Sequence, residues 1–549
     1  METLYQGLKS LGVQAIVGIA IASYAVWTIV SYRRLSHIPG PRWTGVSNIP
    51  HSLAFLSGEC HKWYHAASNK HGKHFWFLLN PKTSRILTRV GPNSLITSSP
   101  ELWARLNAVR SPYTRTEWFY RGCRLEPGMD NVFTMTNDQE HERRRKQVAS
   151  GYSGKENAKL EADIDANVSA LLSLIRSYCT RPGEPSKPMD LAQKIPMFTL
   201  DVISSVGFGT AFGLLAADSD LNGYMASASS GLRINNAIIA LGWAVRRFVD
   251  LPIVCKLGPS AKDSYGFGKM IGTVYEAVDR RVRAGDLDKR SDMLASFMRH
   301  GLRGEALRAE TLEQVIAGSD TTAAAIRGIM LLLLTSPRVF ARLREEVDDA
   351  VRRGGAPQSP EVVAKAQADA LPYLQAVIRE GMRVKLPVVC FFPRDIPAGG
   401  ETWEVDGEQV FIPGGTDVGY SGNAMHHDKG IYGQDAASFR PERWLDKGAN
   451  LPLMTKTNDL IFGHGKWQCL GKSVAMFELG KVIFEVCSTV SSLVCGIVQA
   501  LVNADIHTHG QLVRNFDWTV ENPEKAWDLH NYNGLMHIEN LWVQVQERS

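Results

Sequence analysis

The chain has 549 residues, with 61 Lys and Arg against 56 Asp and Glu, so its formal net charge is +5. Hydrophobic residues make up 44% and charged residues 21% of it, a globular balance that excludes a collagen-like or wholly disordered chain. Charges of both signs interleave, so no nucleic-acid partner is indicated. The eight cysteines form no CxxC pair and no zinc spacing, which excludes a disulfide scaffold or zinc module.

An uncharged apolar segment lies near the start of the chain. Leu11–Tyr32 would form a helix of about 33 Å, enough to cross a bilayer. The basic pair Arg33 and Arg34 follows and predicts that the rest of the chain faces the cytosol. We expect a membrane anchor at 1–35 and one large unit at 36–549. A cleaved signal peptide and a buried core helix are the alternatives; the length of the run and the basic pair argue against the first.

The body reads as mainly α with a minor β portion, without repeats. Phe75–Leu79 and Arg85–Val90 are predicted strands, and Asp406-Gly407 predicts the turn of a hairpin. Ser98 and Ser99 can cap a helix that starts at Pro100. Apolar residues at three- and four-residue spacing predict helices at Asp138–Ser150, Lys155–Ser177, Arg308–Thr335, Pro337–Arg353, Pro372–Arg383 and Leu470–Glu485.

The predicted helix Arg308–Thr335 is interrupted by polar residues. Ala317–Thr322 reads Ala-Gly-Ser-Asp-Thr-Thr, and Gly, Asp and Thr are poor choices for a helix interior. The small residues would let a flat cofactor or dioxygen approach the backbone, and Asp320 and Thr321 could relay protons to it. A kink without chemistry is the alternative for this motif.

Two charged motifs follow. Glu380 and Arg383 share a face of their predicted helix because they lie three residues apart. Arg443 comes later, in Phe-Arg-Pro-Glu-Arg-Trp. If Arg443 meets the first pair, the three form a partly buried triad that fixes the following loop; solvated surface ion pairs are the alternative.

A lone cysteine, Cys469, lies in the glycine-rich turn Phe462–Gly471, just ahead of an apolar helix. Glycines let a backbone pass close to a bulky planar group. A helix N-terminus lowers the pKa of a thiol and points N–H groups at its sulfur. The pattern favours a thiolate that binds a haem iron over a small buried cysteine.

These motifs, in this order and separation, resemble the cytochrome P-450 superfamily of haem-thiolate monooxygenases. The similarity runs from about Pro39 to Val543, and Ala317–Arg327, Asp395–Gly400 and Phe439–Leu445 are especially similar to membrane-bound fungal members of the pisatin-demethylase-like group. The resemblance implies the cytochrome P-450 fold preceded by one N-terminal transmembrane helix. It also implies a single-pass protein of the endoplasmic reticulum membrane with a cytosolic catalytic domain.

The resemblance implies a monooxygenase that carries haem b and oxidises an apolar small molecule with O2. Fungal secondary metabolism is the implied setting, with a terpenoid, polyketide or alkaloid substrate. Cys469 would be the axial thiolate, and Asp320 with Thr321 would deliver protons during oxygen activation. NADPH would act only indirectly, through a separate NADPH-cytochrome reductase, because the chain shows no nucleotide fingerprint. The open alternatives are an O2-independent haem-thiolate isomerase or dehydratase, and a non-catalytic membrane haem protein.

Positions that match the family motifs imply the haem-binding residues: His141, Arg145, Arg394, Phe462, Gly465, Lys466 and Gly471. His141 stands where the family commonly has Trp, and Arg145 and Arg394 would each reach one propionate. Trp467 stands where many members have a basic residue, and Lys466 would substitute for it. A basic face for the reductase, or merely a solvated face, is expected at Arg143, Arg144, Lys146, Lys466 and Lys472.

Two further regions are less specific. Arg110–Asn131 is aromatic and loop-like, so it either covers the substrate or simply packs. Val486–Gln511 matches nothing in the family, whose members would run almost directly from Glu485 into Leu512–Trp518. Our hypothesis is that this insertion is a translated, unspliced intron. A genuine surface loop or an extended helix is the alternative.

Overall fold

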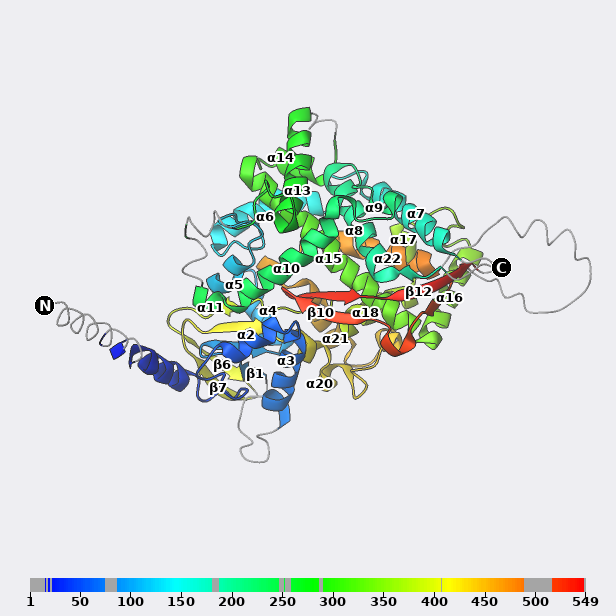
Figure 1. The fold of residues 1–549 in the computed structure, drawn as a ribbon. Helices are drawn as coiled ribbons and strands as arrows, with labels where there is room; N and C mark the ends of the chain where they lie inside the picture. Colours follow the sequence, from blue (N-terminus) through cyan, green and yellow to red (C-terminus); the bar gives the residue numbers. More distant parts are fainter. Residues whose placement is uncertain are drawn as a thin grey trace, which may run out of the picture.

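The computed structural model describes residues 15, 18–19, 22–74, 86–179, 187–245, 251, 258–285, 290–405, 407–487 and 516–547. One long helix, α15 (Gly304–Leu334), runs through the middle of a mostly helical body (Figure 1). Within these residues it is the only helix long and apolar enough to cross a bilayer, yet 72% of its most apolar window is buried inside the protein. We therefore interpret α15 as the central core helix.

The helices that pack directly on α15 come from distant parts of the chain. α8 (Leu191–Phe208), α18 (Pro372–Val384) and α22 (Lys472–Cys487) all contact it, and their apolar side chains belong to the largest hydrophobic cluster. The other principal helices are α2 (Ile49–Leu56), α3 (Cys60–Ala67), α4 (Pro100–Asn107), α5 (Glu117–Gly122), α6 (Asp138–Tyr152), α7 (Leu160–Tyr178), α9 (Leu214–Ala217), α10 (Tyr224–Ala240), α11 (Gly242–Val245), α13 (Gly266–Ala284), α14 (Met293–Arg299), α16 (Pro337–Arg352), α17 (Lys365–Asp369), α19 (Gly422–His426), α20 (Lys429–Tyr432) and α21 (Leu451–Asp459).

The largest sheet has the strand order β1-β2-β8-β5-β3. Its edge strand β3 (Thr114–Arg115) pairs antiparallel with β5 (Arg394–Asp395), and the register sets Arg115 opposite Arg394. This pairing brings two arginines from distant segments to one place. The remaining strands are β1 (Leu87–Arg89), β2 (Ser94–Thr97), β4 (Met189–Asp190), β6 (Glu401–Val405), β7 (Glu408–Ile412), β8 (Asp417–Tyr420), β9 (Phe516–Val520), β10 (Asp528–Tyr532), β11 (Leu535–Glu539) and β12 (Trp542–Glu547).

The predicted secondary structure is confirmed in most places, with shifted ends. The helix expected from Lys155 begins at Leu160, as α7. The side-chain oxygen of Ser99 accepts a hydrogen bond from the Leu102 N–H at 3.2 Å and caps α4 as expected. The predicted hairpin is formed by β6 and β7, where Gly407 has φ +82°. The expected strand Phe75–Leu79 lies outside the described residues.

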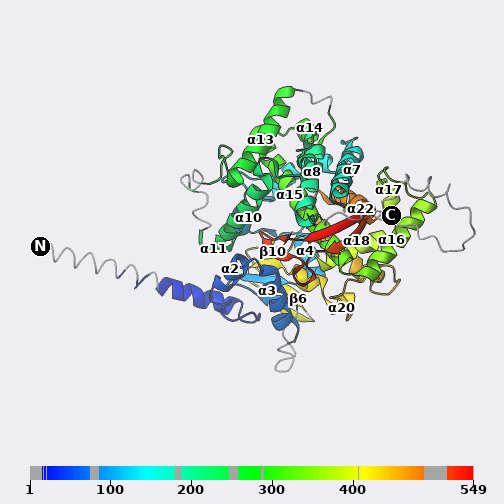
Figure 2. The same ribbon diagram turned by 45° about the vertical axis from the view of Figure 1, so that its right-hand side comes forward.

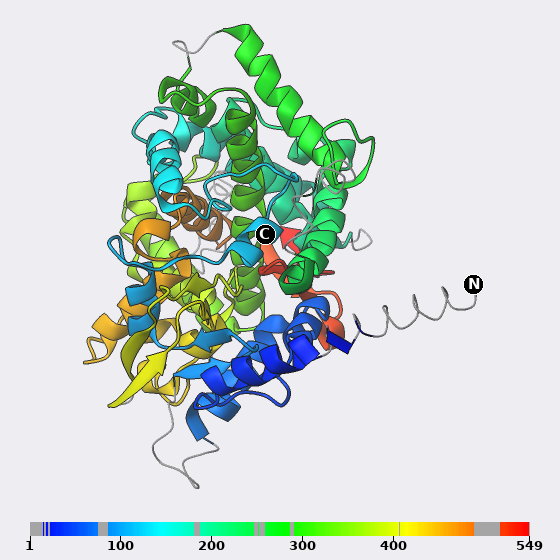
Figure 3. The same ribbon diagram turned by 90° about the vertical axis from the view of Figure 1, so that its left-hand side faces the viewer.

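Two predictions concern segments that are only partly described. Residues 22–34 are helical with largely exposed apolar side chains, for example Val26 and Ile29, and Figures 2 and 3 show this helix leading away from the body. The rest of the expected membrane span lies mostly outside the described residues, so the anchor stays a prediction. Of the insertion, Val486 and Cys487 form the end of α22, and 488–511 lie outside the described residues.

Candidate active site

The loop that carries Cys469 folds tightly because of its glycines. Gly463 and Gly465 have φ angles of +71° and +58°, a region that favours glycine. A Cβ on Gly465 would lie 2.1 Å from the carbonyl oxygen of Asn107, so this glycine lets the loop pass the end of α4. The Cys469 N–H donates to the carbonyl oxygen of Phe462 at 2.8 Å and closes the turn.

The Cys469 side chain retains solvent-accessible surface, although the surrounding protein desolvates its thiol. Burial raises the pKa of the thiol, while the backbone N–H groups of Gly471 and Lys472 and the charge of Arg145 act to lower it. Our expectation of a lowered pKa is wrong, because desolvation outweighs the N–H groups at the helix start. A bound metal ion would deprotonate the thiol through its own charge.

One face in the middle of α15 also retains accessible surface, although the helix lies in the core. Ala317 is exposed and Asp320 and Thr321 are half-buried, although most of the surrounding turns are buried. The Thr321 hydroxyl donates to the Ala317 carbonyl oxygen at 2.8 Å, and burial raises the pKa of Asp320 to about 6. Gly318 has a different role from the one expected. A Cβ there would lie 2.7 Å from Ile203 Cδ1, so Gly318 admits α8 rather than a cofactor.

Basic side chains surround His141 on α6. The imidazole is buried, and its pKa is lowered to about 3 by burial and by the charges of Arg115, Arg145, Arg394 and Lys466. Charges of one sign gathered in a buried region require a compensating partner. The arrangement is therefore suited to an anionic ligand, and it brings Arg394 to His141 and Arg145, which lie one turn apart on α6.

Arg115 is the residue of this cluster that our sequence analysis missed. It is 6% exposed, and its Nη1 donates to the carbonyl oxygens of Val132 at 2.8 Å and Met135 at 3.0 Å. Its Nε is buried without a hydrogen-bond partner among the described residues. The guanidinium carbons of Arg115 and Arg394 lie 5.8 Å and 4.1 Å from the Trp467 ring centre. A buried guanidinium with a spare donor is suited to a carboxylate ligand.

The Lys466 ammonium group already binds three partners within the protein. Its Nζ donates to the carbonyl oxygens of Ser111 at 3.1 Å and Tyr113 at 2.9 Å, and to Asp138 Oδ2 at 2.6 Å. An ammonium group has three N–H donors, so all of them are used. A carboxylate ligand would have to displace one of these partners, and its binding by Lys466 stays a prediction.

Glu380, Arg383 and Arg443 meet in the interior. Glu380 accepts from Arg383 Nε at 2.8 Å and from Arg443 Nε at 2.8 Å, and all three side chains are at most 2% exposed. Trp444 Nε1 adds a hydrogen bond at 2.9 Å, and the Arg440 N–H adds one at 3.0 Å. Burial acts to raise the pKa of Glu380, but the hydrogen bonds and charges of the two arginines lower it on balance.

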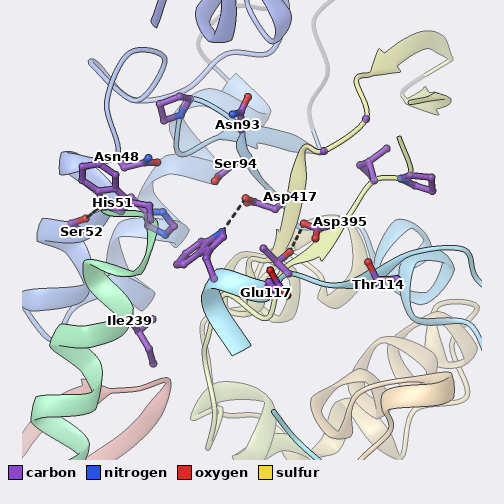
Figure 4. A pocket seen from close by; sticks show the side chains of 18 of the residues that line it. Asn48, His51, Ser52, Asn93, Ser94, Thr114, Glu117, Ile239, Asp395 and Asp417 are labelled. Carbon is purple, nitrogen blue, oxygen red and sulfur yellow. Dashed lines mark hydrogen bonds between the residues drawn. The ribbon is translucent and has the colours of Figure 1, made fainter. Parts of the chain in front are cut away.

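One cavity is lined by other parts of the protein. It encloses about 730 Å³ between α2, α5, α10 and the large sheet, and Trp118 donates to Asp417 at its wall (Figure 4). None of the residues predicted to bind haem or to deliver protons lines it, but Thr114, Thr116, Glu117 and Trp118, from the aromatic segment Arg110–Asn131, do. Thr116 and Asp395 line this cavity, whereas Arg115 and Arg394 face the basic cluster, because neighbouring side chains alternate across strands.

The residues at 38–491 match the family model described as Cytochrome P-450. The chain belongs to the cytochrome P-450 family. It is 35% identical to the cytochrome P-450 monooxygenase ABA1 of Pyricularia oryzae, over 100% of this chain and 99% of that protein. It is 32% identical to the cytochrome P-450 monooxygenase aba1 of Botryotinia fuckeliana, over 90% of this chain and 91% of that protein, and 27% identical to pisatin demethylase of Fusarium vanettenii, over 93% and 91%.

The chain is therefore a cytochrome P-450 monooxygenase, and members of this family carry haem b with an axial cysteine thiolate. The observed residues fit this group. An accessible sulfur with two backbone N–H neighbours suits an iron ligand. A buried cluster of basic side chains, with an unpartnered Nε on Arg115, suits the carboxylates of the propionates.

Proposed function

We propose that this P-450 oxidises an apolar small molecule in fungal secondary metabolism, with Cys469 as the axial thiolate. The observation that carries the proposal is the accessibility of two groups, the Cys469 side chain and the strip of the core helix α15 that holds Asp320 and Thr321. Fungal relatives named as monooxygenases and as pisatin demethylase support the setting. The substrate could be a terpenoid, a polyketide or an alkaloid.

The haem would be oriented by its carboxylates. We infer that Arg115, Arg145, Arg394 and His141 bind the propionates, with Arg115 in the role that many relatives give to a basic residue at the position of Trp467. Phe462, Gly465 and Gly471 would surround the ligand cysteine. Haem held by a thiolate supplies the activation of dioxygen.

Asp320 and Thr321 would deliver protons on the side of the haem opposite to Cys469. A carboxyl whose pKa is about 6 can both hold and release a proton near neutral pH. The Thr321 hydroxyl now donates to the Ala317 carbonyl, and rotation about its side chain would turn the same proton toward the interior. This pair favours a monooxygenase over an O2-independent isomerase or a haem carrier, neither of which needs proton delivery.

The same proposal places the protein in the endoplasmic reticulum membrane. The helix at 22–34 keeps its apolar side chains exposed, which suits lipid better than water. α2 and α10, which pack together, add exposed apolar side chains next to it. These are Ile49, Leu53, Leu56, Ile234 and Ile238.

An NADPH-dependent reductase would supply the electrons. The basic face expected for its docking is smaller in the structure. Arg144 is turned inward and pairs with Glu310 at 2.7 Å, and Lys466 is held by Asp138. Arg143 and Lys146 stay exposed, although Lys146 pairs with Glu142. Docking would thus rest on few charges, and turnover should depend only moderately on salt.

The carbon monoxide difference spectrum of the reduced protein in microsomes tests the proposal. We expect the strongly red-shifted Soret band of thiolate-ligated haem, lost in Cys469→Ala and kept in the control variant Cys390→Ala, whose cysteine is buried elsewhere. A band typical of haem without thiolate in the unmodified protein, or a red-shifted band in Cys469→Ala, would refute the assignment. NADPH- and O2-dependent product formation then separates a monooxygenase from the two alternatives.

A further inference from the structure

Glu313 extends the accessible strip of α15 by one turn. It lies four residues before Ala317 and eight before Thr321, and this spacing sets all three on one side of the helix. Its neighbours Leu312 and Gln314 are buried, whereas Glu313 is only half-buried. A carboxylate therefore borders the interior space that Ala317 and Thr321 also face.

The contact between Glu313 and Asn131 fixes the orientation of the carboxylate. Asn131 Oδ1 accepts from the N–H groups of Phe133 and Thr134, both at 3.0 Å, so its amide must present Nδ2 to Glu313. Nδ2 donates to Glu313 Oε2 at 3.1 Å. Oε1 has no hydrogen-bond partner among the described residues and remains available to a molecule in the interior space.

Glu310, one turn earlier, shows what a purely structural carboxylate looks like here. Its Oε1 accepts from Arg144 Nη1 and from the Val132 N–H, both at 2.7 Å, and the side chain is 2% exposed. Glu310 already ties the segment around Val132 to α15. Glu313 is not needed for that task, and its Oε1 makes no hydrogen bond within the described residues.

We propose that Glu313 is a specificity-determining residue whose free oxygen accepts a hydrogen bond from a hydroxyl group of an otherwise apolar substrate. The inference rests on the proposed function and defines its substrate class more narrowly. Glu313 and Thr321 are separated by about 12 Å along the helix axis. A substrate anchored at Glu313 would thus be held by one end while a carbon far from its hydroxyl is presented for oxidation.

The test uses full-length protein in microsomes and the Soret shift that a bound ligand induces. The probes are cyclododecanol with cyclododecanone and cyclooctanol with cyclooctanone, because each pair differs only in its ability to donate a hydrogen bond. The assay is run at about pH 8, since burial raises the pKa of Glu313 to about 7 and the carboxylate must be ionised to act as acceptor.

We expect the unmodified protein to bind at least one alcohol about tenfold more tightly than its ketone. Glu313→Gln should bring that ratio close to one, because Asn131 holds the amide oxygen and turns the NH2 group inward, and Glu313→Leu should do the same. Glu310→Gln is the matched control and should leave the ratio unchanged, whatever its effect on the affinity for each probe alone. A flat ratio in the unmodified protein, or a ratio that survives in Glu313→Leu, overturns the inference alone. An absent thiolate band in the unmodified protein instead overturns the proposed function.

Discussion

The variant Glu380→Gln examines how the cysteine loop is held in place. The carboxylate accepts five hydrogen bonds at 2.8–3.0 Å, from Arg383 Nε and Nη2, Arg443 Nε, Trp444 Nε1 and the Arg440 N–H. The amide keeps the shape, but it removes the negative charge and points N–H groups at a guanidinium. Arg383 would then lose its only carboxylate partner among the described residues, and Arg443 would keep only Asp435, at 3.3 Å.

The expected cost is large compared with the stability of the fold. Removing one partner of a buried ion pair costs about 3–5 kcal/mol, whereas a whole domain is stable by roughly 5–15 kcal/mol. We therefore expect Glu380→Gln to accumulate poorly and to lose most of the thiolate-type carbon monoxide band. The pKa of Glu380 is lowered in the folded state, so its contribution is present above its unfolded pKa of about 4.5 and is lost as pH falls through the folded value.

The matched control is Glu442→Gln, at the residue next to Arg443. Glu442 pairs with Arg338 and Arg342, whose side chains are 71% and 47% exposed, and such pairs contribute about 1 kcal/mol or less. The measurement is the carbon monoxide spectrum at about pH 7, together with the thermal midpoint in detergent from about pH 8 down to about pH 3, a range that includes the protonation of Glu380. If Glu380→Gln matches Glu442→Gln in both, the triad does not hold the loop and the reasoning is refuted.

The remaining predictions address the haem, the protons and the insertion. Arg115→Gln should release haem faster than the unmodified protein, measured by transfer to apomyoglobin, while Arg115→Lys keeps part of the affinity; equal rates would remove Arg115 from the site. Thr321→Ala should divert a several-fold larger share of NADPH consumption to hydrogen peroxide, and Asp320→Asn should slow turnover at least tenfold with an unchanged carbon monoxide band; unchanged coupling and turnover would contradict the proton-delivery role. Deletion of 486–511 should preserve or increase the thiolate band. Sequencing should show that the spliced transcript lacks the codons for this segment; a transcript that retains them refutes the intron hypothesis.

Much of the secondary structure could be predicted from local patterns, because helix periodicity and capping depend on residues that are close in the sequence. The cap at Ser99 and the hairpin at Gly407 are of this kind. The cysteine loop and the polar break in α15 could likewise be found as motifs. The position of Arg443 against Glu380 was only a conditional hypothesis from the two charged motifs, since they lie far apart in the sequence, and the family resemblance supported it.

What the sequence could not provide depends on pairing and burial. Arg115 joins the basic cluster because β3 pairs with β5, and a two-residue strand leaves no readable periodicity. Lys466 looked available because its three partners come from other segments. The pKa of Cys469 was misjudged because the helix start was visible and the surrounding protein was not. Glu313 resembled any helical glutamate until the buried turns around it were known.

The end of α4 has a consequence for how this enzyme can change. Asn107 accepts a hydrogen bond from Arg394 Nε at 3.1 Å through its side chain, while its carbonyl oxygen leaves room beside it only for a glycine at 465. One residue thus sets the spacing between the thiolate loop and an arginine of the basic cluster. Glu313 lies on another element, α15, so new substrates can be explored by varying it while this spacing is left intact.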